Sequence, residues 1–287
     1  MQPLPYYLGL PLWANARWKG MLFSTDARPA EFLAQYAKVF NAVEGNTTFY
    51  SVPSPEMVLR WASATPENFR FSFKFPRTIT HQQHLIHVAK ETQEFLQRLE
   101  PLGQRLSGLM VQLPASFSPA ETPLLESFLR RLPADYHYAV EVRHPAFFTQ
   151  VSTRAAYNAL LEKLGMNRVI FESRPVHAAL PLDVATREAQ ERKPRLPVQL
   201  DSTAGQPVLR YIGHPELEAN HPWLDRWVAQ TARWLAEGKR PHIFLHTPDN
   251  HLAPELARMF HSQLQRRIPG LASLPTLPAA VGQVSLL

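Results

Sequence analysis

The 287-residue chain contains no cysteine. This absence excludes a disulfide framework, a thiolate nucleophile, cysteine-ligated zinc and ordinary iron–sulfur clusters. Long apolar runs are also missing, because the longest are strand-sized and fall well short of the roughly 18 uninterrupted apolar residues of a membrane span. The first residues show neither the basic nor the apolar region of a secretory signal. We therefore expect a soluble, cytoplasmic protein with no membrane partner.

Positive charge is in excess, but it is not concentrated in one block. The formal charge is +6 and the sequence pI is about 9.7, which favours anionic partners. The basic residues are spread along the chain and mixed with glutamates, as over 187–193, a pattern typical of a solvated helix face. Because a nucleic-acid footprint needs a localised basic stripe, we expect a small anionic or sugar-like ligand rather than nucleic acid.

Eight short runs rich in aromatic and branched residues predict strands. They are Tyr6–Trp13, Ala42–Phe49, Phe69–Pro76, Ser107–Pro114, His137–Pro145, Arg168–Arg174, Pro207–His214 and His242–Thr247. Successive runs begin about 27 to 40 residues apart, the length of one strand–helix–strand unit, and eight such units close a parallel barrel. An open doubly wound sheet is the alternative, disfavoured because no glycine-rich phosphate loop follows any run.

These observations predict the α/β class and a single closed (β/α)8 barrel of the TIM type. We expect one domain over 1–287, with the barrel over about 6–268 and a Pro/Leu-rich tail over 269–287 that wraps the surface. The long irregular link from Pro175 to Gln206 contains several prolines and one expected short helix. A lid over the barrel mouth and a passive surface insertion are both compatible with this link.

Helix signals stand between the predicted strands. Pro29 and the pair Ser118–Pro119 each precede an apolar helical pattern, as expected for first-turn positions. Ser152 is expected to cap a helix over 153–164 that Gly165 ends. A helix over 221–237 places three tryptophans on one face, which predicts packing against the outside of the barrel.

Polar residues late in the predicted strands are the candidates for a site, because active sites in parallel barrels lie at the C-terminal ends of the strands. Side chains alternate along a strand, so Glu44 and Asn46 share one face of the second strand, and Glu141 and Arg143 share one face of the fifth. The other candidates are Lys74, Gln112, His144, Glu172, Arg210 and His246.

Two functions remain open for this set. In the first, the chain is an enzyme in which Glu44 and Glu141 are the catalytic acid and base, cations orient an anionic substrate, and Asn46 and Gln112 supply neutral hydrogen bonds. In the second, the chain is a non-catalytic ligand- or nucleic-acid-binding protein, and the charges form a structural network of ion pairs. The sequence does not identify a cofactor.

Three histidines at a spacing of three follow the third predicted strand: His81, His84 and His87. This spacing permits a metal site on one helix face. No His-Glu-x-x-His motif accompanies it, so loop capping and solvent-facing histidines are the favoured interpretation, and we predict no metal.

Several motifs resemble one known family. They are the stretch Val43–Tyr50, the stretch Phe71–Lys74, Ile79–His81, Gln112–Pro114 and Glu141–His144. In this order they resemble the YecE-like family, domain of unknown function seventy-two, over nearly the whole chain. The resemblance implies a TIM-type barrel and brings no established reaction or substrate.

Overall fold

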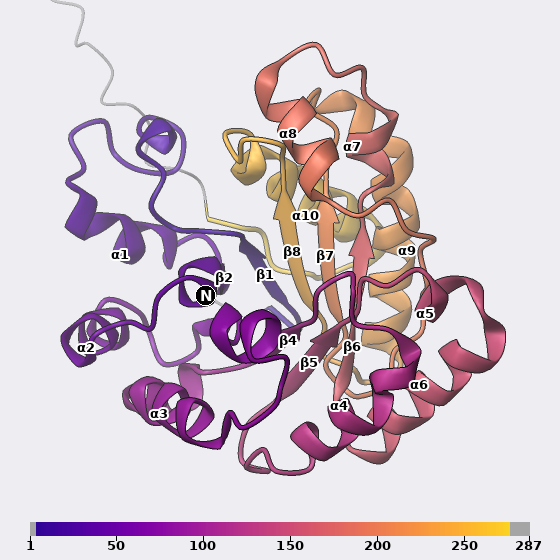
Figure 1. Ribbon diagram of the computed structural model, residues 1–287. Coiled ribbons are helices and arrows are strands. Elements are labelled where there is room, and N and C mark those ends of the chain that lie inside the picture. The colour runs from indigo at the N-terminus through magenta and orange to yellow at the C-terminus, as the bar shows by residue number, and fades with distance from the viewer. Residues whose placement is uncertain (1–3, 276–287) are drawn as a thin grey trace, which may run out of the picture.

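A ring of parallel strands forms the centre of the computed structural model, which describes residues 4–275 (Figure 1). The strands are β1 (Tyr7–Leu10), β2 (Ala42–Gly45), β3 (Arg70–Phe73), β4 (Leu109–Gln112), β5 (Tyr138–Glu141), β6 (Asn167–Glu172), β7 (Val208–Ile212) and β8 (His242–His246). Their order is β3-β2-β1-β8-β7-β6-β5-β4, and two isolated parallel bridges, Phe71 to Leu106 and Lys74 to Met110, join β3 to the β4 region. The predicted barrel is confirmed, and the open sheet is wrong.

Helices surround this ring (Figure 1). They are α1 (Phe32–Tyr36), α2 (Pro55–Ser63), α3 (Ala89–Leu99), α4 (Thr122–Leu129), α5 (Ala146–Thr149), α6 (Val151–Lys163), α7 (Arg174–Ala178), α8 (Val184–Arg192), α9 (His221–Ala236) and α10 (Ala253–Arg267). Short 3-10 or π turns cover Ala16–Trp18, Pro29–Glu31, Asn46–Phe49, Thr78–Gln82, Glu100–Arg105, Pro119–Glu121 and Glu218–Asn220.

Most of the helix signals act where the sequence places them. Pro29 begins the 3-10 turn that leads into α1, and Ser118 forms a capping box with Glu121 before α4. Gly165 follows α6 with a φ of 64°, a conformation that favours glycine. The start of α6 was predicted wrongly: the helix begins before Ser152, and Gln150 occupies the cap position.

The face of α9 that carries tryptophans packs on the barrel as predicted. Trp227 and Trp234 are buried, and Trp223 is partly buried against the same core. The helix ends at Ala236, and Gly238 follows it with a φ of 74°. A second apolar cluster takes one residue from every strand except β3 and fills the barrel interior: Tyr7, Ala42, Met110, Ala139, Val169, Val208 and Phe244.

Several strands end earlier than predicted. The second strand stops at Gly45, so Asn46 and Thr48 lie in a 3-10 turn rather than on the strand face. A Cβ atom on Gly45 would lie 2.2 Å from the Phe73 ring, so this position requires glycine. Thr48 fixes the turn by donating a hydrogen bond of 2.7 Å to the Lys74 carbonyl. Arg143 likewise follows β5 instead of lying within it.

The long link after β6 contains two helices, α7 and α8, where one was expected. Both lie above the C-terminal ends of β7 and β8 (Figure 1). Residues 269–275 run back along α10, where the His261 ring contacts the Ala272 carbonyl at 2.9 Å and Arg258 donates to the Pro275 carbonyl. The predicted course of 276–287 lies outside the described residues. Within 4–275, no helix is long and apolar enough to cross a membrane.

Candidate active site at the barrel mouth

Arg210 is the centre of a buried charge cluster at the upper end of the barrel. It lies in β7, and its guanidinium holds Glu44 of β2 through two hydrogen bonds of 2.7 and 2.8 Å. The same guanidinium donates to Glu141 of β5 at 2.6 Å. All three residues are at most 1% exposed. One arginine therefore joins carboxylates from strands that are not neighbours, which requires that all three side chains point into the barrel.

Arg143 extends the cluster toward the opening. Its Nε donates to the second Glu141 oxygen at 2.8 Å, and 19% of its side chain is exposed. Within the described residues this is its only hydrogen bond, so both terminal nitrogens remain unbonded. Phe171 of β6 lies beneath Arg143 and Arg210, with its ring centroid 5.9 and 5.4 Å from their guanidinium carbons.

The two carboxylates stay ionised in this environment. Burial alone would raise the pKa of Glu141, but Arg210, Arg143 and Lys74 outweigh it and lower the pKa to about 2. Burial also acts to raise the pKa of Glu44, and the bidentate Arg210 holds that pKa well below its usual range. A carboxylate with so low a pKa is a weak base near neutral pH. The geometry thus favours Glu44 and Glu141 as the anchors of Arg210.

Lys74 enters the same cluster directly after β3. Its Nζ lies 3.9 Å from Glu44 Oε1, too far for a hydrogen bond, and 5.9 Å from the centre of the Phe49 ring. Burial lowers the pKa of Lys74 well below its usual range, and the positive charge of Arg210 lowers it further. Arginines occupy the better positions on both carboxylates, so the positive charge of Lys74 is incompletely compensated and its proton is held weakly.

This arrangement predicts that Lys74→Met stabilises the protein. A buried ammonium without a hydrogen-bonded partner costs folding free energy, and methionine has a similar length without the charge. We expect the free energy of unfolding at pH 7, measured by urea denaturation, to rise by about 1–2 kcal/mol. Functional sites typically retain residues that lower stability in this way. Because the folded pKa lies below the unfolded one, wild-type stability should also rise with pH relative to the variant.

Lys90→Met is the matched control for this measurement, because the Lys90 side chain is 84% exposed. Its stability should stay within about 0.5 kcal/mol of wild type. A loss of stability in Lys74→Met would instead identify Lys74 as a structural ion-pair partner of Glu44.

Neutral polar atoms without partners also lie at the C-terminal ends of the strands. Gln112 Oε1, His246 Nε2 and Asn46 Oδ1 are enclosed, and none has a hydrogen bond within the described residues. Burial lowers the pKa of His246 to about 4 despite the opposing charge of Glu44, whose Oε2 lies 3.6 Å from Nε2. Enclosed polar atoms without partners are costly, and a bound ligand would satisfy them.

One predicted site residue faces away from the mouth, and another makes a local contact after β5. Glu172 binds Arg174 and accepts a hydrogen bond of 3.1 Å from Trp227 of α9, so it faces the helices. The interior positions of β6 are Val169 and Phe171, and Glu172 has the opposite parity. His144 directly follows Arg143 and accepts a hydrogen bond of 3.2 Å from the amide of Ala146, the first residue of α5.

Two further residues belong to the mouth although the sequence did not place them there. Burial, together with the nearby charge of Arg143, lowers the pKa of His81 to about 4. The resemblance motif Ile79–His81 was the available signal for this residue. Burial also lowers the pKa of Lys193 to about 8, with Arg210 as the largest neighbouring charge. Lys193 directly follows α8, so the link after β6 brings a cation over the mouth.

The histidine triplet does not converge on one point. His81 faces the mouth, His84 pairs with Glu121, and His87 lines a groove on the flank of the barrel. Between residues 4 and 275, no group of three or more His, Asp or Glu side chains is arranged to hold a metal ion.

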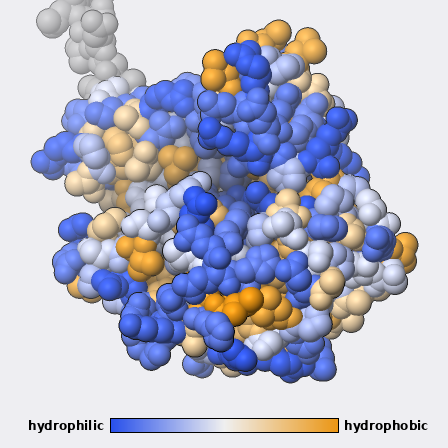
Figure 2. Space-filling view, viewed as in Figure 1, coloured by the Kyte–Doolittle hydropathy of each residue, from blue (hydrophilic) through white to orange (hydrophobic). Residues whose placement is uncertain are grey.

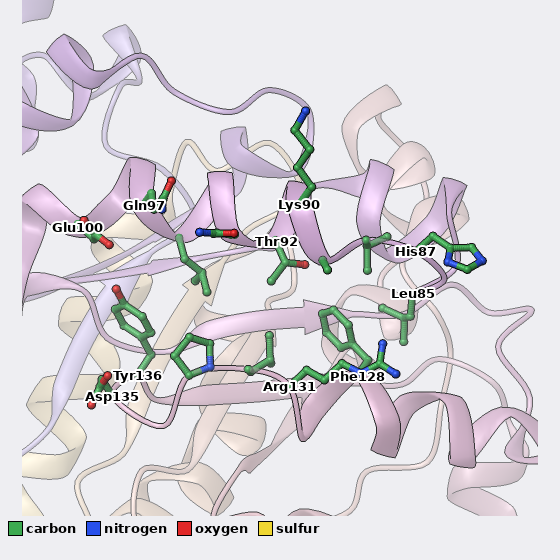
Figure 3. Close-up of a pocket in the computed structure, with 16 residues that line it drawn as sticks. Leu85, His87, Lys90, Thr92, Gln97, Glu100, Phe128, Arg131, Asp135 and Tyr136 are labelled. Atoms are coloured by element: carbon green, nitrogen blue, oxygen red, sulfur yellow. The ribbon is translucent and has the colours of Figure 1, made fainter.

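The surface has hollows of different character. The molecule is hollowed over the upper ends of β1 and β8, beside the α7–α8 segment (Figure 2). A second groove of about 850 Å³ lies between α3 and the segment that follows α4 (Figure 3). Its walls include Leu96, Phe128 and Leu132, and no residue of the charge cluster lines it. The charged residues of the candidate site therefore lie at the mouth and not in this groove.

The fold and the site together define the class of this protein. It is a TIM-type barrel with a charge cluster at the C-terminal ends of its strands. The model of a family described as "Protein of unknown function DUF72" matches residues 7–280, and the chain belongs to this family, which confirms the resemblance. The chain is 43% identical to the UPF0759 protein YecE of Escherichia coli K12, over 95% of this chain and 97% of that protein.

Solved structures of the family have the same fold. A DUF72 protein from Thermotoga maritima, TM1631, superposes with a TM-score of 0.70 at 23% identity, over 91% of this chain and 99% of that one. A DUF72 protein from Enterococcus faecalis, EF0366, gives a TM-score of 0.67 at 20% identity, over 93% and 98%. These identities support the fold alone.

Proposed function

We propose that the barrel mouth is the active site of an enzyme that acts on a small anionic substrate by proton transfer. The observation that carries this proposal is the unbalanced charge of the mouth. Arg210 uses both carboxylates, whereas Arg143 has two free terminal nitrogens and Lys74 has no hydrogen-bonded partner within residues 4–275. A carboxylate, phosphate or sulfate group on a ligand would supply the missing negative charge.

Each residue has a distinct role in this proposal. Glu44 and Glu141 hold Arg210 in place and stay ionised, Arg143 binds the anionic group, and Gln112 donates to or accepts from the substrate. Lys74, whose pKa is lowered chiefly by burial, is the group that accepts and returns a proton, and His246, with a pKa of about 4, is a neutral hydrogen-bonding group beside it. The sequence suggested Glu44 and Glu141 as the catalytic acid and base. Their low pKa values favour the anchoring role instead.

Turnover is tested by incubating the purified protein with a metabolite extract and following which compounds are consumed and which are only retained. We expect at least one anionic compound to be consumed by wild type. Arg143→Ala should slow its consumption by about a hundredfold, because one charged donor is lost from the transition state. The control is Arg130→Ala, which removes an exposed arginine that pairs with Glu126 on α4.

Retention of a compound without its consumption would favour the non-catalytic alternative. If no anion is either retained or consumed, the cluster is a structural network and the proposal is wrong.

A further inference from the structure

Lys74 has the surroundings of a nucleophilic amine. Its Nζ is 3.9 Å from the nearest carboxylate oxygen, and it makes no hydrogen bond with any described residue. The side chain is 9% exposed, against 0% for Glu44, so a small part of the lysine reaches the mouth while the carboxylate is fully enclosed. A lysine that is desolvated and lies beside other cations is an amine available for attack on a carbonyl.

A histidine lies on the other side of the same carboxylate. Lys74 lies against Oε1 of Glu44, and His246 Nε2 lies 3.6 Å from Oε2. His246 Nε2 is enclosed and has no hydrogen-bonded partner among the described residues. Glu44 itself cannot move to bind the lysine, because both of its oxygens accept hydrogen bonds from Arg210.

We propose that Lys74 forms an imine with a small aldehyde or ketone that carries a carboxylate or phosphate group. The inference rests on the proposed function, since Arg143 would bind the anionic group while Lys74 attacks the carbonyl. The Nζ lone pair forms a bond to the carbonyl carbon, and a proton moves from nitrogen to oxygen to give a carbinolamine. The carbon–oxygen bond then breaks, water leaves with the second amine proton, and the C=N bond forms. No oxidant or reductant is consumed.

Borohydride trapping tests this step on the full-length protein. Glyoxylate, pyruvate and pyridoxal phosphate serve as anionic carbonyl probes, and acetaldehyde is the probe without an anionic group. Borohydride reduces an imine to a stable secondary amine, and peptide mapping by mass spectrometry locates it. At pH 7 we expect Lys74 to be labelled at least about tenfold faster than the exposed Lys90, because only an unprotonated amine reacts.

Three comparisons make the result specific. Inorganic phosphate should slow the labelling of Lys74 but not that of Lys90. Arg143→Ala should abolish the preference for anionic probes over acetaldehyde, and Lys74→Met should lose this adduct while Lys90 is still labelled. Peptide mapping of wild type alone decides the matter if a variant does not fold.

Labelling of Lys74 no faster than Lys90 overturns the inference. If phosphate nevertheless stabilises the protein through Arg143, the proposed anion site stands and Lys74 only carries a proton. If phosphate also has no effect, the proposed function fails with it.

Discussion

Arg210→Ala is expected to lower the free energy of unfolding by about 3–5 kcal/mol at pH 7, the usual cost of breaking a buried ion pair by removing one partner. The substitution leaves Glu44 and Glu141 enclosed without the guanidinium that holds both of them. Chemical denaturation followed by circular dichroism measures the loss. Arg130→Ala is the matched control, and removing its exposed pair should cost no more than about 1 kcal/mol.

The pH dependence of this loss has a definite sign. In wild type the folded pKa of Glu141 is depressed to about 2, so its stabilisation is complete above the unfolded pKa and disappears as pH falls toward 2. Without Arg210, burial dominates and raises the carboxylate pKa values. The variant should therefore gain stability between pH 7 and pH 5, and wild type should not. A variant within about 1 kcal/mol of wild type at pH 7 would contradict the central role of Arg210.

A small anion is expected to stabilise the native protein strongly. At about 100 times its Kd, a ligand that binds only the folded state adds roughly 2.7 kcal/mol, which corresponds to a Tm increase of about 5–10 °C for a chain of this size. Thermal melts with phosphate and with phosphorylated or carboxylated metabolites measure the shift, against chloride at equal ionic strength. Arg143→Ala should abolish it, because both terminal nitrogens of Arg143 have no partner among residues 4–275.

The affinity should depend on the charge of Lys193. The pKa of Lys193 is lowered to about 8, first by burial and then by Arg210, and an anion favours its protonated form. Affinity should thus be high below pH 8 and fall about tenfold between pH 7 and pH 9. Lys193→Gln should weaken binding at pH 7 and remove this dependence. Unchanged melting temperatures across a broad millimolar panel would mean that Glu44 and Glu141 already neutralise the mouth.

Alternation along the strands predicted part of the site. Glu44 and Glu141 follow small interior residues, Ala42 and Ala139, at a spacing of two, and the structure places all four inside the barrel. The same reasoning did not work for Glu172. Both faces of a parallel barrel strand are buried, so an apolar run does not reveal which parity points inward. Glu172, the last residue of β6, points toward the surrounding helices and accepts a hydrogen bond from Trp227 there.

The sequence by itself determined the number and order of the strands, most helix starts, the absence of cysteine chemistry and the family. These features depend on local periodicity, helix capping and residue type, and such signals lie in residues that are close together in the sequence. Only the tertiary structure decided that Arg210 joins carboxylates from two distant strands, and that Lys193 returns from α8 to the mouth. Such contacts depend on barrel closure and on the path of a long link, and no local pattern specifies either.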